Sequence, residues 1–198
     1  MSTTAKNNIG IFLDRDGTIN VEIFFLKNPD DLSLIPDAAK AIREMNEMGL
    51  KVFVITNQSG IARGYLTEDD LHLVHKKLTE LLQKENAFLD AMYYCKHFFE
   101  ESAPAEEKCT CRKPNIGMLQ QAEKEFGIDL KKSFVVGDRF VDVNAGKNAG
   151  ATSILVRTGY GEEALQWAIE NNVSVDYVAK NLYDAWQRIK ELLLKNNE

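Results

Sequence analysis

The chain has 198 residues, of which 44% are hydrophobic and 27% are charged, and its formal net charge is −6. This length and composition predict one globular domain over residues 1–198 with a full hydrophobic core. An acidic chain without a long apolar segment is not expected to follow a nucleic-acid backbone, to cross a membrane or to carry a secretory signal. We therefore expect a cytoplasmic, monomeric protein with no nucleic-acid or membrane partner.

Strand-like apolar runs alternate with helical patterns along the chain. In chain order we expect strand Ile9–Leu13, helix Ala38–Met48, strand Val52–Ile55, helix Glu68–Glu85, strand Ala91–Tyr94, helix Gly117–Phe126, strand Phe134–Val136, helix Val141–Ala149, strand Ser153–Val156, helix Glu162–Glu170, a short strand near Tyr177 and helix Leu182–Leu194. This alternation predicts an α/β fold with a doubly wound, mainly parallel sheet. The segments between the strands leave no room for a sizeable lid domain, which indicates an open site.

Two carboxylates, Asp14 and Asp16, follow the first expected strand directly, and Gly17 allows a tight turn after them. Ligands of open α/β sheets bind outside the carboxyl ends of the strands. Two acids so close together repel each other, and a hard cation such as Mg²⁺ relieves that repulsion. The repulsion is also expected to raise one pKa of the pair, which would suit Asp16 as a proton donor.

Three further segments carry polar groups next to expected strands or helices. Thr56, Asn57, Gln58 and Ser59 follow the second strand, with donors for phosphate oxygens. Arg112 and Lys113 precede a helix, and Asp138 and Arg139 follow a strand, with Asp142 one turn farther along. Asp142 could bind a metal through water or cap its helix, and the sequence leaves both open.

All three cysteines lie in the segment 95–111, where Cys95 and His97 precede an acidic spacer and Cys109 and Cys111 follow it. Three thiolates and one imidazole are typical of a closed, structural zinc site. The alternative is that the cysteines are ordinary small hydrophobic residues. His72 and His75, by contrast, are spaced like a metal pair but are expected to lie on a solvated helix face.

The order of these residues resembles that of the haloacid dehalogenase superfamily, whose four motifs are met by Asp14/Asp16, Thr56, Lys113 and Asp138. The resemblance implies a haloacid-dehalogenase-like Rossmannoid fold of the capless type. The segment 56–64 and the cysteine loop are similar to those of the D-glycero-D-manno-heptose 1,7-bisphosphate phosphatase family. Two positions depart from that family, because Lys96 replaces a proline and Arg139 replaces a lysine.

The resemblance implies Mg²⁺-dependent removal of the 7-phosphate of a sugar bisphosphate in nucleotide-activated heptose biosynthesis. Asp14 would be the nucleophile, Asp16 the general acid and base, and Thr56 and Lys113 would complete the catalytic set. The implied Mg²⁺ ligands are Asp14, Asp138 and the Asp16 carbonyl, and the implied zinc ligands are Cys95, His97, Cys109 and Cys111. The implied substrate-binding residues are Asn57, Gln58, Ser59, Arg112 and Arg139.

Three other interpretations stay open. A histidinol-phosphate phosphatase would share the zinc ligands, although Tyr93-Tyr94 and the eleven-residue spacer 98–108 favour the heptose enzymes. A polynucleotide 3′-phosphatase would share the segment 56–64 but calls for a basic, aromatic groove. A non-enzymatic receiver-type phosphoacceptor would not need Asp16 as an acid and base.

Overall fold

The computed structural model describes residues 8–99 and 109–195. The acidic spacer between the two pairs of predicted zinc ligands falls mostly in 100–108, so it lies largely outside the described residues, as do the polar N-terminal residues 1–7 and the last three residues.

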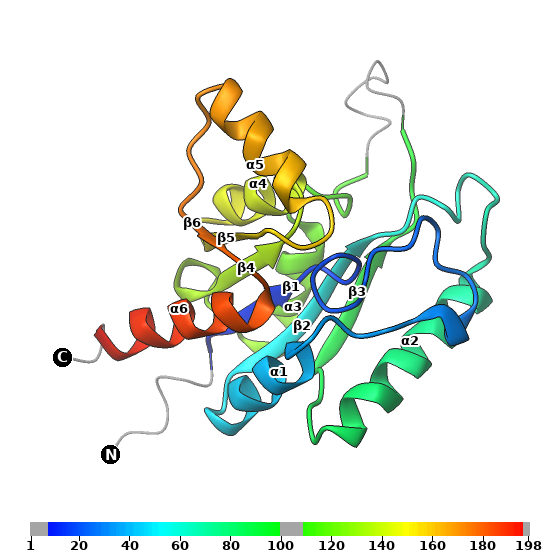
Figure 1. Ribbon diagram of the computed structural model, residues 1–198, viewed down its shortest axis with the longest axis horizontal. Helices are drawn as coiled ribbons and strands as arrows, with labels where there is room; N and C mark the ends of the chain where they lie inside the picture. The colour runs from blue at the N-terminus through cyan, green and yellow to red at the C-terminus, as the bar shows by residue number, and fades with distance from the viewer. Residues whose placement is uncertain (1–7, 100–108, 196–198) are drawn as a thin grey trace.

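Six parallel strands form one sheet in the order β3-β2-β1-β4-β5-β6 (Figure 1). The strands are β1 Gly10–Leu13, β2 Lys51–Asn57, β3 Ala91–Cys95, β4 Phe134–Gly137, β5 Thr152–Val156 and β6 Tyr177–Ala179. Every pairing between neighbours is parallel, which confirms the predicted doubly wound sheet. The chain winds outward from β1 in both directions, so the topological switch point lies at the carboxyl ends of β1, β2 and β4.

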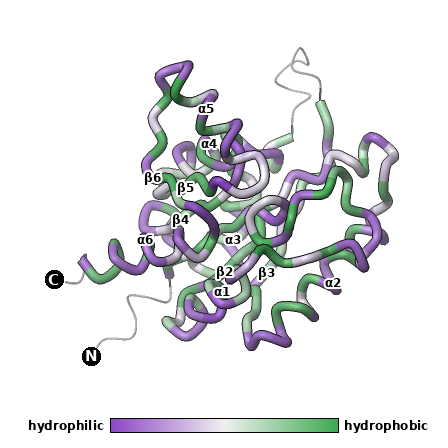
Figure 2. Tube along the Cα trace, viewed as in Figure 1, coloured by the Kyte–Doolittle hydropathy of each residue, from purple (hydrophilic) through white to green (hydrophobic). Residues whose placement is uncertain are grey.

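Helices cover both faces of the sheet. They are α1 Ala38–Glu47, α2 Glu68–Lys84, α3 Gly117–Phe126, α4 Phe140–Ala149, α5 Gly161–Glu170 and α6 Leu182–Lys195, with single 3₁₀ turns η1 Pro29–Asp31 and η3 Leu130–Lys132. Buried residues of α1, α2 and α6 pack on one face of the sheet, and those of α3 pack on the other face. Helix α4 lies on the same face as α3, where the Ser153 Oγ of β5 donates a hydrogen bond to the Val143 carbonyl of α4. Hydrophobic and hydrophilic stretches alternate along α2 and α6, as expected of helices with one buried side (Figure 2). Among the described helices, none is long and apolar enough to cross a membrane.

The register of the sheet brings the ends of three strands to one level. Leu13 pairs with Val54 on one side and with Val136 on the other. The Asp14 amide then donates to the Val136 carbonyl over 2.9 Å, so Asp14 leaves β1 beside the end of β4. The residues that follow these strands are therefore held close together by backbone pairing alone.

Several element boundaries differ from those predicted by one or two residues, and those of β2 and β3 extend a strand toward the site. β2 includes Thr56 and Asn57, and β3 includes Cys95, because each residue pairs with its neighbour in the sheet. His75 does not lie on a solvated helix face, so that prediction was wrong for this residue. Its side chain lies on the buried side of α2, and burial together with nearby Arg15 lowers its pKa to about 3. His72 is exposed, as predicted.

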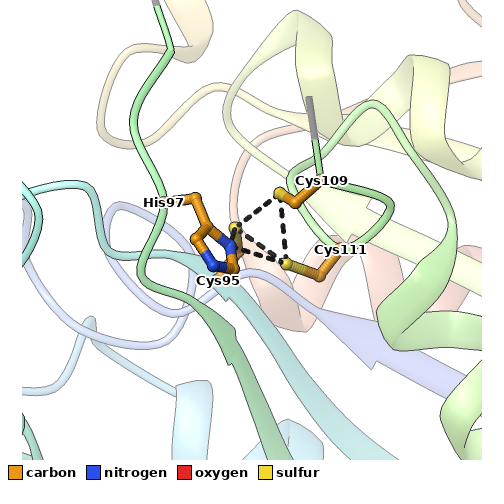
Figure 3. A group of neighbouring side chains, drawn as sticks. All are labelled: Cys95, His97, Cys109 and Cys111. Carbon is orange, nitrogen blue, oxygen red and sulfur yellow. Dashed lines mark hydrogen bonds between the residues drawn. The ribbon is translucent and has the colours of Figure 1, made fainter. Parts of the chain in front are cut away.

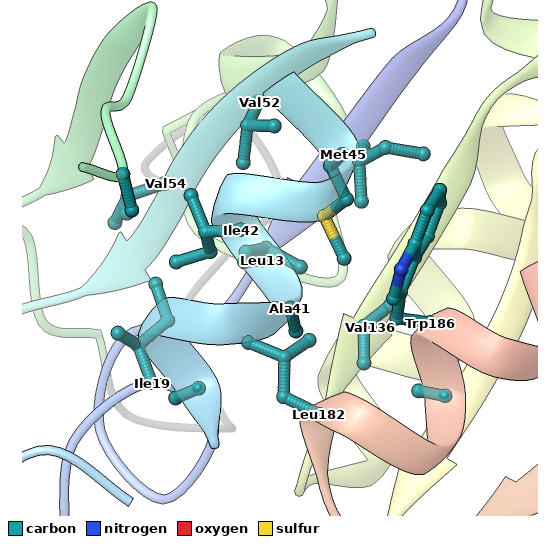
Figure 4. Packing of buried hydrophobic residues seen from close by; sticks show 14 of the residues in the cluster. Leu13, Ile19, Ala41, Ile42, Met45, Val52, Val54, Val136, Leu182 and Trp186 are labelled. Atoms are coloured by element: carbon teal, nitrogen blue, oxygen red, sulfur yellow. The ribbon is translucent and has the colours of Figure 1, made fainter. Parts of the chain in front are cut away.

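Trp186 of α6 is the largest side chain with no exposed surface, and it packs with Met45 and Val136 between α1 and the sheet (Figure 4). Its indole Nε1 donates to Glu44 Oε2 over 2.8 Å. The ring thus fills core volume and satisfies its one polar atom at the edge of the core. Trp167 of α5, by contrast, is 47% exposed.

We expect Trp186→Ala to lower the free energy of unfolding by about 3–5 kcal/mol, because it leaves a cavity and removes a hydrogen bond. Trp167→Ala is the matched control and should lose about 1 kcal/mol, as an ordinary partly exposed substitution does. Urea unfolding of both variants measures the difference, and equal losses would contradict the role given to Trp186.

Candidate active site

A cluster of three buried carboxylates lies at the carboxyl ends of β1 and β4. Oxygen atoms of Asp14, Asp138 and Asp142 lie within 4.8 Å of one another. Burial raises the pKa of Asp14 to about 7, with Lys113 opposing the rise, and burial with the neighbouring acids raises that of Asp138 to about 8. Asp138 Oδ2 accepts from the Tyr160 amide, but the buried Oδ1 has no hydrogen-bond partner among the described residues. The cluster therefore has the negative charge and the unpaired carboxylate oxygen that are typical of a cation-binding site.

Lys113 balances part of this charge. Its buried Nζ lies 2.7 Å from Asp14 Oδ1 and 2.6 Å from Asp142 Oδ1, and it donates to the Ile55 carbonyl over 2.7 Å. Although burial opposes protonation, the two carboxylates raise the pKa of Lys113, so the ammonium stays charged. Asp142 Oδ2 also accepts from the Arg139 amide over 3.0 Å. This is the helix-capping contact that the sequence left open for Asp142.

Asp16 differs from Asp14 in its environment, and the expected rise in its pKa was wrong. Burial acts to raise the pKa of Asp16, but the charge of Arg15 and the hydrogen bonds from Arg15, Asn20 and Gln58 together hold it below its usual value. The Arg15 guanidinium binds both carboxylate oxygens, at 3.0 and 2.6 Å. Asn20 and Gln58 each donate one further hydrogen bond, at 2.9 Å. The Arg15 side chain has no exposed surface. The sequence analysis did not identify it, because an arginine between two acidic residues is usually a solvent-exposed side chain.

The loop after β2 connects the acid pair to Lys113. Gln58 Nε2 donates to Thr56 Oγ1 over 2.8 Å as well as to Asp16, so its amide links the two strand ends. Asn57 binds the backbone of Lys113 twice, accepting from its amide at 3.0 Å and donating to its carbonyl at 3.1 Å. Both ends of the Asn57 amide are thus engaged within the protein, which fixes Lys113 against β2.

These groups open into one cavity of about 540 Å³. Its floor includes Asp14, Asp16, Thr56 and Lys113, and its walls include the following predicted substrate-binding residues: Asn57, Gln58, Ser59, Arg112 and Arg139. The Arg139 guanidinium stacks on the Tyr160 ring at 3.8 Å, a contact suited to its flat shape and not to the lysine of the family pattern. Glu22, which the sequence analysis did not name, also lines the cavity and is half-buried.

The cysteine loop brings its four predicted ligands together (Figure 3). Sulfur and Nδ1 atoms of Cys95, His97, Cys109 and Cys111 lie 3.0–3.5 Å apart in their closest pairs, and no disulfide joins the thiols. A tetrahedral zinc with bonds of about 2.3 Å has edges of roughly 3.7 Å, so a small outward shift would fit the ion. His72 and His75 belong to neither metal-ligand cluster of the described residues.

Lys96, which stands where the family pattern has proline, ties this loop to α2. Its ammonium pairs with Glu68 in the first turn of α2, and Tyr94 also donates to Glu68, over 2.9 Å. Arg112 then joins the two ends of the loop, since its Nη1 donates to the His97 carbonyl over 3.2 Å. The Lys96–Glu68 and Arg112–His97 contacts therefore restrict the loop at the position where the family has a proline that restricts the backbone.

Comparisons with known proteins agree with this geometry. Residues 110–185 match the family described as HAD-hydrolase-like. The D-glycero-beta-D-manno-heptose-1,7-bisphosphate 7-phosphatase of Haemophilus influenzae is 39% identical over 181 residues, covering 88% of this chain and 98% of that protein. The enzyme of the same name from Escherichia coli K12 is 39% identical over 189 residues, covering 94% of this chain and 96% of that one.

Among solved structures, the D,D-heptose 1,7-bisphosphate phosphatase from B. bronchiseptica, in complex with magnesium and phosphate, superposes with a TM-score of 0.81. It is 30% identical and the match covers 94% of this chain and 99% of that one. These relatives are phosphatases, which excludes the receiver-type interpretation. The chain is a phosphoric monoester hydrolase and belongs to the heptose-1,7-bisphosphate 7-phosphatase family of haloacid-dehalogenase-like enzymes.

Proposed function

We propose that this enzyme removes the 7-phosphate of D-glycero-D-manno-heptose 1,7-bisphosphate through an aspartyl-phosphate on Asp14, in nucleotide-activated heptose biosynthesis. The observation that carries the proposal is the pairing of Asp14 with Lys113 at the floor of a cavity that also holds Asp16. The named activity of the relatives supports the choice of substrate. The expectation of a monomeric, cytoplasmic enzyme stays a prediction.

In the first half-reaction, Asp14 Oδ2 attacks phosphorus while the bond from phosphorus to the sugar oxygen breaks. Lys113 holds Oδ1 of the same carboxylate at 2.7 Å, which orients the nucleophile. Its ammonium also offsets the negative charge that builds up as two anions meet. Thr56, Gln58 and Ser59 line the space where the phosphoryl oxygens would lie, and Thr56 and Ser59 offer hydroxyl donors.

Asp16 gives its proton to the departing sugar oxygen and then takes a proton from the water that hydrolyses the aspartyl-phosphate. Arg15 favours the ionised form of Asp16 in the free protein. A phosphate dianion beside Asp16 acts in the opposite direction, because a neighbouring negative charge raises the pKa of a carboxyl group. Substrate binding thus supplies the proton-donor state, and Arg15 restores the base for the second half-reaction.

The carboxylate cluster fits Mg²⁺, since Asp138 has a buried oxygen without a partner among the described residues and the pKa values of Asp14 and Asp138 are raised by burial and by the neighbouring carboxylates. Asp14, Asp138 and the Asp16 backbone carbonyl would hold the ion. When bound, Mg²⁺ reduces the repulsion between the nucleophile and the phosphate.

The cysteine cluster fits zinc, because its soft donors converge without leaving a place for water or substrate. Its role would be structural. The two ends of the cysteine loop meet at this cluster, and Arg112 and Lys113 follow Cys111 directly. A bound zinc ion would therefore hold the backbone of these two residues in place.

Two carboxylate substitutions test the mechanism. Asp14→Asn should abolish turnover, because an amide does not attack phosphorus. Asp16→Asn should lower kcat by about 10²–10⁴-fold, the usual contribution of general acid–base catalysis. Phosphate release under saturating substrate measures both, with exposed Asp69→Asn as the control that should keep full activity. Substantial turnover by Asp14→Asn would contradict its assignment as the nucleophile.

Metal content tests the cysteine cluster. We expect one tightly bound zinc per chain in protein purified without chelator, and a loss of that zinc in Cys109→Ser and His97→Asn. The matched control is His72→Asn, which removes an exposed histidine outside the cluster and should keep the metal. Elemental analysis decides the matter, and a zinc-free, metal-replete wild-type protein would show that the cluster is not a zinc site.

Substrate preference tests the proposed activity. The kcat/KM for heptose 1,7-bisphosphate should exceed that for histidinol phosphate by about ten- to a hundredfold, since one charge-assisted hydrogen bond to a second phosphate contributes roughly 1.5–3 kcal/mol. Histidinol phosphate instead carries a cationic amine, which Arg112 and Arg139 repel. Arg112→Ala should reduce this preference, whereas Arg188→Ala on α6 should keep it. Comparable values for the two substrates in the wild type would favour histidinol-phosphate phosphatase.

A further inference from the structure

Arg63 lies at the rim of the cavity, within a cluster of aromatic rings that the reaction itself does not use. Its guanidinium carbon lies 5.4 Å from the centroid of the Phe25 ring, 5.1 Å from that of Tyr65 and 5.0 Å from that of Phe98. These rings come from three separate segments, which follow β1, β2 and β3. Arg63 is therefore the point where the three loops around the cavity meet.

The Phe25 and Tyr65 rings that contact Arg63 are held in place by close packing with their neighbours. Phe25 stacks on Tyr65 with 4.3 Å between the ring centroids. A Cβ atom at Gly60 would come within 2.7 Å of Phe25, so the close approach of this ring requires glycine there. Phe25 also has a positive φ of 54°, a conformation that a non-glycine residue adopts only when its surroundings hold it.

The N–H groups of the Arg63 guanidinium have no hydrogen-bond acceptor among the described residues. The rings engage the guanidinium through their π faces, whereas its N–H donors make no hydrogen bond and no ion pair with any described residue. The side chain is exposed on the cavity side, and Arg112 lines the same cavity without a carboxylate partner among the described residues. A planar guanidinium with free donors suits a phosphate group.

The Arg139 side of the cavity has a different charge balance. Glu22 lines the cavity together with Arg139, and the pKa of Glu22 is raised by burial and by Asp16, with the charge of Arg139 acting in the opposite direction. The positive charge of Arg139 is therefore partly compensated within the protein. The uncompensated positive charge lies with Arg63 and Arg112.

We propose that Arg63 is a specificity-determining residue that, with Arg112, binds the second phosphate of the bisphosphate substrate, and that the ring cluster holds its guanidinium in position. This inference rests on the proposed function, because it assigns one end of that substrate. It adds a residue from the loop after β2 to the two arginines identified from the sequence.

The test compares two sugars that differ only in the second phosphate, heptose 1,7-bisphosphate and heptose 7-phosphate. In Arg63→Gln the ratio of their kcat/KM values should fall by about ten- to a hundredfold, as expected for one lost charge-assisted interaction, and the loss should appear in KM. Arg63→Lys keeps the charge without the planar fork, so its ratio should lie between those of the wild type and Arg63→Gln. The control, Arg188→Gln, replaces a partly exposed arginine of α6 outside the cavity and should keep the wild-type ratio.

An unchanged ratio in Arg63→Gln would overturn the inference. So would an equal loss for both sugars, because that result would show that Arg63 only supports the fold of the rim. These outcomes are distinct from a failure of the proposed function, which would appear as a wild-type enzyme that does not prefer the bisphosphate at all. That failure would remove this inference too.

Discussion

The geometry of the site depends on one buried ammonium group, Lys113 Nζ. It lies within 2.7 Å of oxygens from three segments: the Asp14 carboxylate after β1, the Ile55 carbonyl in β2 and the Asp142 carboxylate in α4. Without it, Asp14 and Asp142 would be buried negative charges with little compensation, which is a large energetic penalty. The position of Lys113 is in turn fixed by Asn57, which binds its backbone. The position of the Asp14 carboxylate thus depends on contacts between parts of the chain that are far apart in sequence.

Much of this arrangement could be predicted from the sequence, because parallel pairing forces the ends of β1, β2 and β4 to one edge. Apolar runs followed by Asp14, Thr56 and Asp138 were sufficient to predict both the sheet and the residues that meet there. The spacing of cysteines and histidine likewise predicted the four-residue cluster. These are local signals, and each depends on residue type and order alone.

What the sequence did not reveal depends on tertiary contacts. The pKa of Asp16 is lowered because Arg15 turns inward and binds it, although the spacing of the acids suggested a rise. His75 is buried because α2 presents that side chain to the protein interior, and a helical pattern rich in charge concealed this. The ring cluster around Arg63 joins three loops, and no sequence motif encodes their meeting.

The cysteine loop leaves and rejoins the protein at nearly the same place, since Cys95 and Cys109 lie in contact and the Arg112 side chain reaches the His97 carbonyl. The segment between His97 and Cys109 is therefore anchored at both ends by groups that take no part in bond cleavage. Loop closure depends only weakly on loop length. The position of Lys113 beside Asp14 therefore does not depend on the length of this segment, whose described residue Phe98 lines the cavity, so this is a place in the fold where substrate contacts can change without disturbing the chemistry.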